Sequence, residues 1–266
     1  MKIVLLVKQV PETGSVRLDE TTGTVIRKAA DAVVNPLDLY AVEAALRLKE
    51  ACGAETLALS MGPASAESAL REVLAMGIDD ARLVSDKAFA GSDTWATSRI
   101  LAEAIRKTVP AFDLILCGER ATDGDTGQVG PETAAALGIP AVTYVSRIGA
   151  CRDGALALDR LIEGATEVLS VRLPALVTVV KAVATPRLPT LDGKIRARGA
   201  VLPVLTQRDL GLPADQVGLR GSPTRVVRTF RPQISRACQR HRAADPALAV
   251  AAAGELHRFL AGKGLL

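Results

Sequence analysis

The most constraining feature of this sequence is an alternation of short apolar, β-branched runs with longer stretches of helical spacing. The strand-like runs are 2–7, 55–61, 81–85 and 113–117, and the helix-like stretches are 35–52, 65–77 and 94–108. Parallel strands need a helical crossover of this length to return to the same sheet edge. The pattern therefore predicts an α/β fold with a doubly wound, mostly parallel sheet.

The pattern changes after residue 140. Four further strand-like runs, 142–148, 155–162, 166–173 and 175–180, follow one another with turns too short for helices. We expect them to form an antiparallel extension of the sheet. We interpret 1–205 as a nucleotide- or flavin-binding α/β domain. Residues 206–266 are rich in Pro, Gly and Arg, with one helix-like segment near 246–260, and are expected to form a C-terminal arm.

Helix-end signals support these boundaries. Asn35 is expected to cap the first helix with Pro36 at its first position, and Gly53 to end it. Asp93 is expected to begin the helix over 94–108. In the stretch 185–198, Pro189 and Gly193 would let the chain turn sharply, and in an extended segment the alternating Lys194, Arg196 and Arg198 would lie on one side.

Charge and composition narrow the class of partner. The chain has 266 residues and a net charge of +4, but residues 181–242 hold 13 Lys+Arg against 3 Asp+Glu. Only 3% of residues are aromatic, so base stacking has little to work with and nucleic acid is not expected. An acidic protein partner fits better. No apolar run is long enough to span a membrane, and a cytoplasmic protein is expected.

The sequence gives little support for a catalytic site or a metal-binding site. The four cysteines are scattered without a CxxC pair, and only His241 and His257 accompany them, so neither a disulfide framework nor a metal site is indicated. The same two late histidines leave no Ser-His-Asp constellation, and no catalytic residue is expected. An adenylate-forming enzyme is disfavoured because the sequence has no SGGxDS-like pyrophosphate motif.

The stretch CGERATDGDTGQVGPETAAALGIP, residues 117–140, is the candidate binding turn. It follows a strand, and Pro131 restricts the next helix to a start at Gly127 or Gln128. Free amides at such a helix start favour a phosphate, while Asp123 can accept from ribose hydroxyls and Thr126 can donate to a phosphate oxygen. Alternatively, the aspartates cap the turn and nothing binds. The residues alone leave both interpretations open, because neither a P-loop nor a GxGxxG motif is present.

Several stretches together resemble the β subunit of electron transfer flavoprotein over nearly the whole chain. They are VKQVPETG at 7–14, NPLDLYAVEAAL at 35–46, GPASAESALREVLAMGIDDARLVSD at 62–86, the turn above, RLIEGATEVLSVRLPALVT at 160–178 and TPRLPTLDGKIRARG at 185–199. One position departs from the family pattern: Ala165 replaces the Gly or acidic residue common there.

The resemblance implies a partner α subunit that carries an FAD. In the bifurcating branch, which includes nitrogen-fixation-associated proteins, the β subunit binds a second FAD that accepts electrons from NADH and passes them on to partner dehydrogenases. In the housekeeping branch it binds a structural AMP, and electrons pass from acyl-CoA dehydrogenases to a quinone reductase. The forms DGDTGQVGP at 123–131, VKQVP at 7–11 and GSPTRVV at 221–227 resemble the bifurcating branch.

The resemblance also assigns roles to positions. Residues implied to bind the nucleotide or flavin are Val7, Lys8, Gln9, Asn35, Asp38, Met61, Gly62, Gly118, Asp123, Gly124, Thr126, Gly127, Gln128 and Val129. Residues implied to bind the dehydrogenase partner are Leu191, Lys194, Arg196 and Arg198. Plainer roles remain open for some of them: Asn35 as a helix cap, Asp38 as a solvated acid, Lys8 in a surface ion pair, Met61 or Leu191 in the core.

Overall fold

The structure is a computed structural model that describes residues 1–12, 17–18, 25–26, 32–227, 240–241, 243 and 245–266. It divides into two units, Met1–Val227 and Arg228–Leu266. The first unit holds the sheet and its flanking helices. Within the second, α8 (Pro246–Gly262) forms where the late helix was expected, and Asp245 caps it by accepting from the Leu248 amide at 2.9 Å. Among the described residues, no helix is long and apolar enough to cross a membrane.

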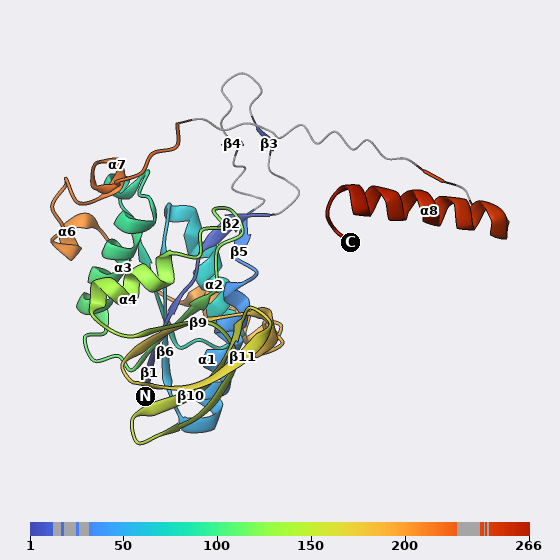
Figure 1. The fold of residues 1–266 in the computed structure, drawn as a ribbon. Coiled ribbons are helices and arrows are strands. Elements are labelled where there is room, and N and C mark those ends of the chain that lie inside the picture. The colour runs from blue at the N-terminus through green and yellow to red at the C-terminus, as the bar shows by residue number, and fades with distance from the viewer. Residues whose placement is uncertain (13–16, 19–24, 27–31, 228–239, 242, 244) are drawn as a thin grey trace. The chain divides into compact units, whose positions relative to one another are not determined.

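A nine-stranded sheet organises the first unit (Figure 1). Its strands, in spatial order, are β11 (Ala165–Arg172), β10 (Ala155–Ile162), β9 (Ala141–Arg152), β12 (Ala175–Val179), β8 (Leu114–Gly118), β1 (Lys2–Leu6), β6 (Glu55–Met61), β7 (Asp80–Val84) and β13 (Val204–Leu205). The seven strands from β9 to β13 pair in parallel, and β10 and β11 pair antiparallel. Two short pairs lie outside it, β2 (Gln9–Pro11) with β5 (Ala32–Val34) and β3 (Arg17–Leu18) with β4 (Val25–Ile26).

Helices cover both faces of the parallel part. Since side chains alternate along a strand, Ile3 and Leu5 of β1 pack on one face while Val4 and Leu6 pack on the other. The first face is covered by α1 (Asp38–Cys52) and α2 (Glu67–Met76), and the second by α3 (Thr94–Thr108) and α4 (Val129–Leu137). Both faces are therefore buried, which confirms the predicted doubly wound α/β sheet.

Several predicted boundaries are confirmed. β6 and α3 occupy the predicted ranges, and Asp93 caps α3 by accepting from the Ala96 amide at 3.0 Å. Gly53 ends α1 with φ +67°, a left-handed conformation that favours glycine.

The predicted start of the first helix is wrong. α1 begins at Asp38, whose amide donates to the Asn35 carbonyl at 2.9 Å, and Asn35 is not its side-chain cap. The Asn35 side chain instead binds the loop after β8, because its amide nitrogen donates to the Arg120 carbonyl at 2.9 Å. A tertiary contact has replaced the local one.

The predicted antiparallel extension is correct for β9, β10 and β11 only. β12 lies between β8 and β9 and runs parallel to both. The returning chain passes from β11 through the turn at 173–174 and enters the interior of the sheet, where all five residues of β12 are buried.

Residues 185–198, called the recognition segment below after their proposed role, do not form an extended segment with the three basic residues on one side. From Leu191 to Gly199 the chain forms helix α5, and Thr190 caps the helix by accepting from the Gly193 amide at 2.9 Å. Lys194 and Arg198 are therefore neighbours on one helical face, and Arg196 points elsewhere, donating to the Leu74 carbonyl at 2.9 Å.

Residues 206–227, which we placed at the start of the arm, fold with the first unit. α6 (Gln207–Leu210) and α7 (Gly218–Gly221) lie next to α3, and Leu210 and Val217 are buried in the core on that side of the sheet. The division between units falls at 227/228. Residues 228–239 of the expected arm lie outside the described residues.

The close packing of α5 on α2 gives a stability prediction. A Cβ at Gly193 would lie 2.1 Å from the Ala75 carbonyl oxygen, whereas a Cβ at Gly199 of the same helix meets nothing within 4 Å. Gly193→Ala should therefore lower the free energy of unfolding by about 1 to 3 kcal/mol, measured by urea titration. Gly199→Ala is the matched control and should be neutral or stabilising. Equal effects at both positions would show that α5 does not pack closely on α2.

Candidate functional site

The candidate site lies where the order of the sheet reverses. From β1 the chain moves outward through β6 to β7 on one side, and then returns to add β8 on the other side of β1. Ligands of open α/β sheets bind at such a switch point, at the carboxyl ends of the strands. The loops 7–9 and 118–129, which hold most of the residues singled out in the sequence, leave β1 and β8 at this point.

The buried carboxylate of Asp38 ties these two strand ends together. Its Oδ2 accepts from the Lys8 amide at 2.8 Å, just after β1, and its Oδ1 accepts from the Gly118 amide at 3.1 Å, at the end of β8. A Cβ at Gly118 would lie 2.7 Å from that Oδ1, so the contact requires glycine. Asp38 is only 5% exposed, and burial raises its pKa to about 7.

Asn35 makes the second link between the loops. Its backbone amide donates to the Lys8 carbonyl at 2.7 Å, its side-chain nitrogen donates to the Arg120 carbonyl, and its Oδ1 accepts from the Thr122 amide at 3.2 Å. The side chain is fully buried and all of these partners lie in the two loops. Asn35 therefore fixes the two loops relative to each other through these hydrogen bonds.

Lys8 and Gln9 extend from the first loop in different directions. The Lys8 ammonium forms a 2.8 Å ion pair with Asp123 across the switch point. The Gln9 side chain turns to the start of α2, where it donates to Ser65 and Ser68 and accepts from the Ser65 hydroxyl. Ser65 and Ser68 were missed in the sequence, which offers no local signal for them.

Three further predicted residues mark neighbouring strand ends. Val7 is buried, and its amide donates to the Leu59 carbonyl at 3.0 Å. Met61 is the last residue of β6 and is partly buried against the core on the α3 side. The Gly62 amide donates to Val84 at 3.1 Å. These residues form the β6 side of the switch point.

The turn after β8 has the features of an anion site. Gly127 has φ +64°, and α4 then begins at Val129 with Gln128 at its N-cap. The amides of Gln128, Val129 and Gly130 donate no hydrogen bond to any residue that the structure describes. Asp123, Gly124 and Thr126 are exposed beside them. This set of backbone donors fits a phosphate at the positive end of α4.

A neighbouring cluster was missed in the sequence. The Thr94 hydroxyl, at the start of α3, lies 3.3 Å from Glu132 and 3.4 Å from the Gln128 side chain. The other carboxylate oxygen of Glu132 is buried without a partner among the described residues. The Asp93 carboxylate also accepts hydrogen bonds from the Thr224 hydroxyl and amide, at 2.7 and 2.9 Å. The segment GSPTRVV at 221–227 thus reaches the same corner, a position that the sequence had not indicated.

An open cleft lies elsewhere on the surface. It has a volume of about 840 Å³ and is lined by residues from 180–185 together with Arg47, Glu119, Tyr144 and Leu161. Of the loops at the switch point, only Glu119 contributes to it. In the described residues, no group of His, Cys, Asp and Glu side chains is arranged to hold a metal ion.

The predicted partner-binding residues lie apart from the site on α5. Leu191 is 76% exposed, so it does not belong to the core, and Lys194, Arg196 and Arg198 are exposed with it. The structure groups these four residues on one short helix but brings none of them to the switch point.

A doubly wound sheet with free backbone amides at a helix start beside its switch point is the arrangement typical of nucleotide-binding proteins. The family model described as "Electron transfer flavoprotein domain" matches residues 22–209, and the chain therefore belongs to the electron transfer flavoprotein family. This confirms the resemblance drawn from the sequence.

Relatives place the chain among the β subunits of that family. It is 44% identical over 238 residues to the electron transfer flavoprotein subunit beta of Thermoanaerobacterium thermosaccharolyticum, covering 89% of this chain and 90% of the relative. It is 45% identical over 233 residues to the caffeyl-CoA reductase-Etf complex subunit CarD of Acetobacterium woodii, covering 87% and 88%. It is 41% identical over 238 residues to the protein FixA of Azorhizobium caulinodans, covering 87% and 85%.

The raised pKa of Asp38 predicts a pH dependence of stability. Between pH values of about 4 and about 7 the folded chain keeps a proton on Asp38 that the unfolded chain releases. The free energy of unfolding contributed by this group therefore falls as the pH rises through that window. Asp38→Asn cannot titrate, so the stability of the wild type minus that of the variant should decline from pH 4 to pH 7 in urea titrations. A difference that rises with pH would contradict the assignment.

Proposed function

We propose that this chain is the β subunit of a heterodimeric electron transfer flavoprotein of the bifurcating type, which binds FAD at the β1/β8 switch point and takes electrons from NADH. The single observation that carries the proposal is the turn 123–130, where the amides at the start of α4 have no partner among the described residues and exposed Asp123 and Thr126 precede them in the same turn. Relatives whose names include CarD and FixA support the branch.

The protein's own groups would bind and orient the cofactor. The amides at 128–130 and the Thr126 hydroxyl would donate to phosphate oxygens, and Asp123 would accept from a ribose hydroxyl. Lys8, which is paired with Asp123, would offset part of the phosphate charge. Bound FAD supplies the hydride and single-electron chemistry, while the chain supplies position and electrostatics.

The polar frame behind these groups would hold the geometry. Asp38 and Asn35 join the two loops through backbone amides and carbonyls, so the loops keep their spacing without contributing to the chemistry. Met61 and Gly62 would lie on the β6 side of the base. A second candidate is a structural AMP. It is favoured because the proposed phosphate donors come from one helix start, that of α4, and AMP carries a single phosphate group.

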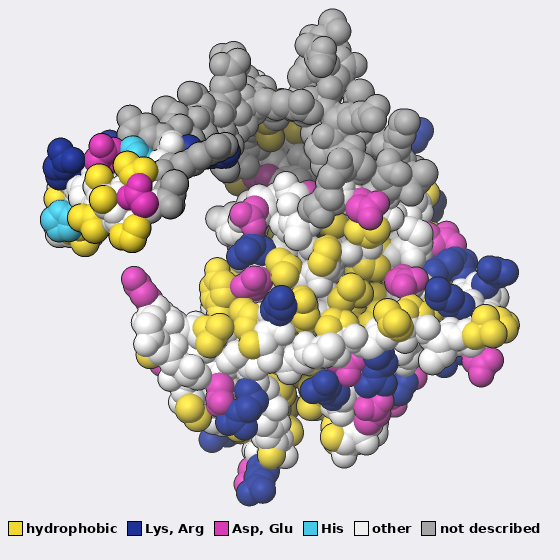
Figure 2. Space-filling view, turned by 90° about the vertical axis from the view of Figure 1, so that its right-hand side faces the viewer, with side chains coloured by type: hydrophobic (Ala, Val, Ile, Leu, Met, Phe, Trp, Pro, Cys, Tyr) yellow, Lys and Arg dark blue, Asp and Glu magenta, His cyan; other side chains and the backbone are white. Residues whose placement is uncertain are grey.

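We also propose the partners. Members of this family pair with an α subunit, and Figure 2 shows hydrophobic side chains gathered across the middle of one face of this chain. Exposed apolar residues lining the clefts include Tyr144, Leu161 and Ile162. An FAD-bearing α subunit would cover such a surface, with the C-terminal arm lying against it. The recognition segment would dock an acyl-CoA dehydrogenase-like or other dehydrogenase through Leu191.

The nature of the nucleotide is tested directly by its mass. The heterodimer purified with its α subunit is denatured in acid, and the released nucleotides are quantified by mass spectrometry. The proposal expects two FAD per heterodimer. One FAD and one AMP would reject the bifurcating function and support the housekeeping one.

A further inference from the structure

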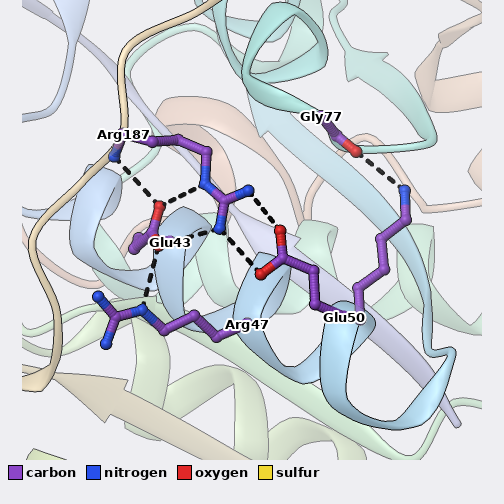
Figure 3. Close-up of polar contacts among 6 residues, drawn as sticks. Glu43, Arg47, Glu50, Gly77 and Arg187 are labelled. Carbon is purple, nitrogen blue, oxygen red and sulfur yellow. Dashed lines mark hydrogen bonds and ion pairs between the residues drawn. The ribbon is translucent and has the colours of Figure 1, made fainter.

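Arg187, which precedes α5, makes an unusually complete set of contacts with α1 (Figure 3). Its Nε donates to Glu43 at 2.8 Å and its Nη2 to the same carboxylate at 3.1 Å. Its Nη1 and Nη2 also donate to Glu50, at 2.5 and 3.2 Å. The Arg187 backbone amide donates to Glu43 as well, at 3.1 Å. The side chain and the backbone of one residue are thus fixed to two carboxylates.

These two carboxylates are placed to receive one guanidinium. Glu43 and Glu50 are seven residues apart on α1, which puts them on the same face two turns apart. The Glu43 side chain is 5% exposed, and burial alone would raise its pKa. The hydrogen bonds from Arg187 and Arg47 outweigh that effect and hold the pKa of Glu43 below its usual range. Glu43 is therefore a buried carboxylate kept charged by Arg187.

Apolar packing alone does not fix the neighbouring helix. Along α5 only Gly193 and Ala197 are buried, and these small residues bury little apolar area. The end of α5 is held by Arg71, which donates to the carbonyls of Ala197 and Arg198. Its beginning is held by the Thr190 cap and, three residues earlier, by Arg187.

This beginning is where the exposed apolar side chains lie. Leu191 is the first residue of α5, Leu188 follows Arg187 directly and is 85% exposed, and Ile195 lies one turn into the helix. A change in the path of residues 187–190 would move Leu188 and Leu191 first, because the far end of α5 is fixed independently.

We propose that Glu43 and Glu50, acting through Arg187, are positioning residues that fix the start of the recognition segment and so the direction in which Leu191 is presented to the dehydrogenase. This inference rests on the proposed docking role of the segment. It assigns specificity to residues on α1 that do not touch the partner.

The test uses the flavin-loaded heterodimer and a purified acyl-CoA dehydrogenase that exchanges electrons with the wild type. In Arg187→Gln, amide hydrogen exchange over residues 186–192 should be about tenfold faster, since a charged tether is lost. Exchange in α2 and flavin content should be unchanged. The KM for the dehydrogenase should rise with kcat preserved. If Arg187→Gln folds poorly, Glu50→Gln takes its place. It should show the same changes to a smaller degree, because the Glu50 carboxylate is more exposed than that of Glu43.

Two further variants separate geometry from charge. Arg47→Gln is the matched control, because it removes another arginine from Glu43 without touching the segment, and it should leave both exchange and KM at wild-type values. Arg187→Lys keeps the charge but loses the fork that spans two carboxylates. It should lie between wild type and Arg187→Gln. Wild-type behaviour of Arg187→Lys would overturn the proposal, since charge alone would then suffice.

The docking role is tested separately by Leu191→Ala. A raised KM with normal exchange supports docking through Leu191. If Leu191→Ala raises the KM while Arg187→Gln leaves it unchanged, docking stands and the positioning proposal fails. Unchanged exchange in Arg187→Gln also overturns the proposal. If neither variant changes the KM, the docking role itself is wrong and the inference fails with it.

Discussion

The buried carboxylate of Asp38 is the interaction on which the geometry of the site depends. Burying a carboxylate is costly unless hydrogen bonds compensate it, and here the two compensating donors are backbone amides from the ends of β1 and β8. Those strands run parallel, but the chain leaves their ends toward opposite sides of the sheet, from β1 to β6 and from β8 to β9. Asp38, reinforced by Asn35, fixes their spacing. The exposed groups that would meet a nucleotide, Lys8 and Asp123, are placed on this frame.

The same helix that begins at Asp38 also carries Glu43 and Glu50. α1 is a 15-residue helix packed on the sheet, with the loops of the switch point at its N-terminus and the Arg187 contacts along the face that holds Glu43 and Glu50. A rigid element of this kind relates the position of the proposed cofactor site to that of the proposed recognition segment. Electron transfer between proteins depends on distance and orientation, so a fixed relation between these two places serves the proposed function.

Local signals made much of this structure predictable. Periodicity identified β6 and α3 to the residue, and the Asp93 cap and Gly53 stop were correct because each depends on neighbours in sequence. Predictions failed where tertiary contacts decided. Asn35 has the composition of a cap, yet the loop at 120–122 takes its side chain. Proline and glycine in 185–198 suggested a sharply turning loop, but the Thr190 cap and the contacts with α2 make residues 191–199 a helix.

The candidate site could likewise be predicted only in part, because some of its features are local in sequence and others depend on tertiary contacts. The turn 123–130 was visible as a glycine-rich break before a helix, and the resemblance extended it to Lys8, Asn35 and Asp38. Periodicity does not encode strand order, and several features of the site depend on strand order. These are the burial of Asp38, its bridge between two loops, and the position of Thr94 and Glu132 beside the turn. The insertion of β12 between β8 and β9 is likewise a choice of topology that its residues, apolar except for Thr178, do not reveal.

The most direct test of the nucleotide site is Thr126→Glu in the heterodimer. A carboxylate beside the free amides at the start of α4 would compete with and repel a phosphate. The account predicts loss of the nucleotide bound to this chain with the FAD of the α subunit retained, as measured by acid release and mass spectrometry. Thr126→Ser, which keeps the hydroxyl, should retain both. Retention of both nucleotides in Thr126→Glu, or loss of both from a folded heterodimer, would contradict the placement of the nucleotide at the β1/β8 switch point.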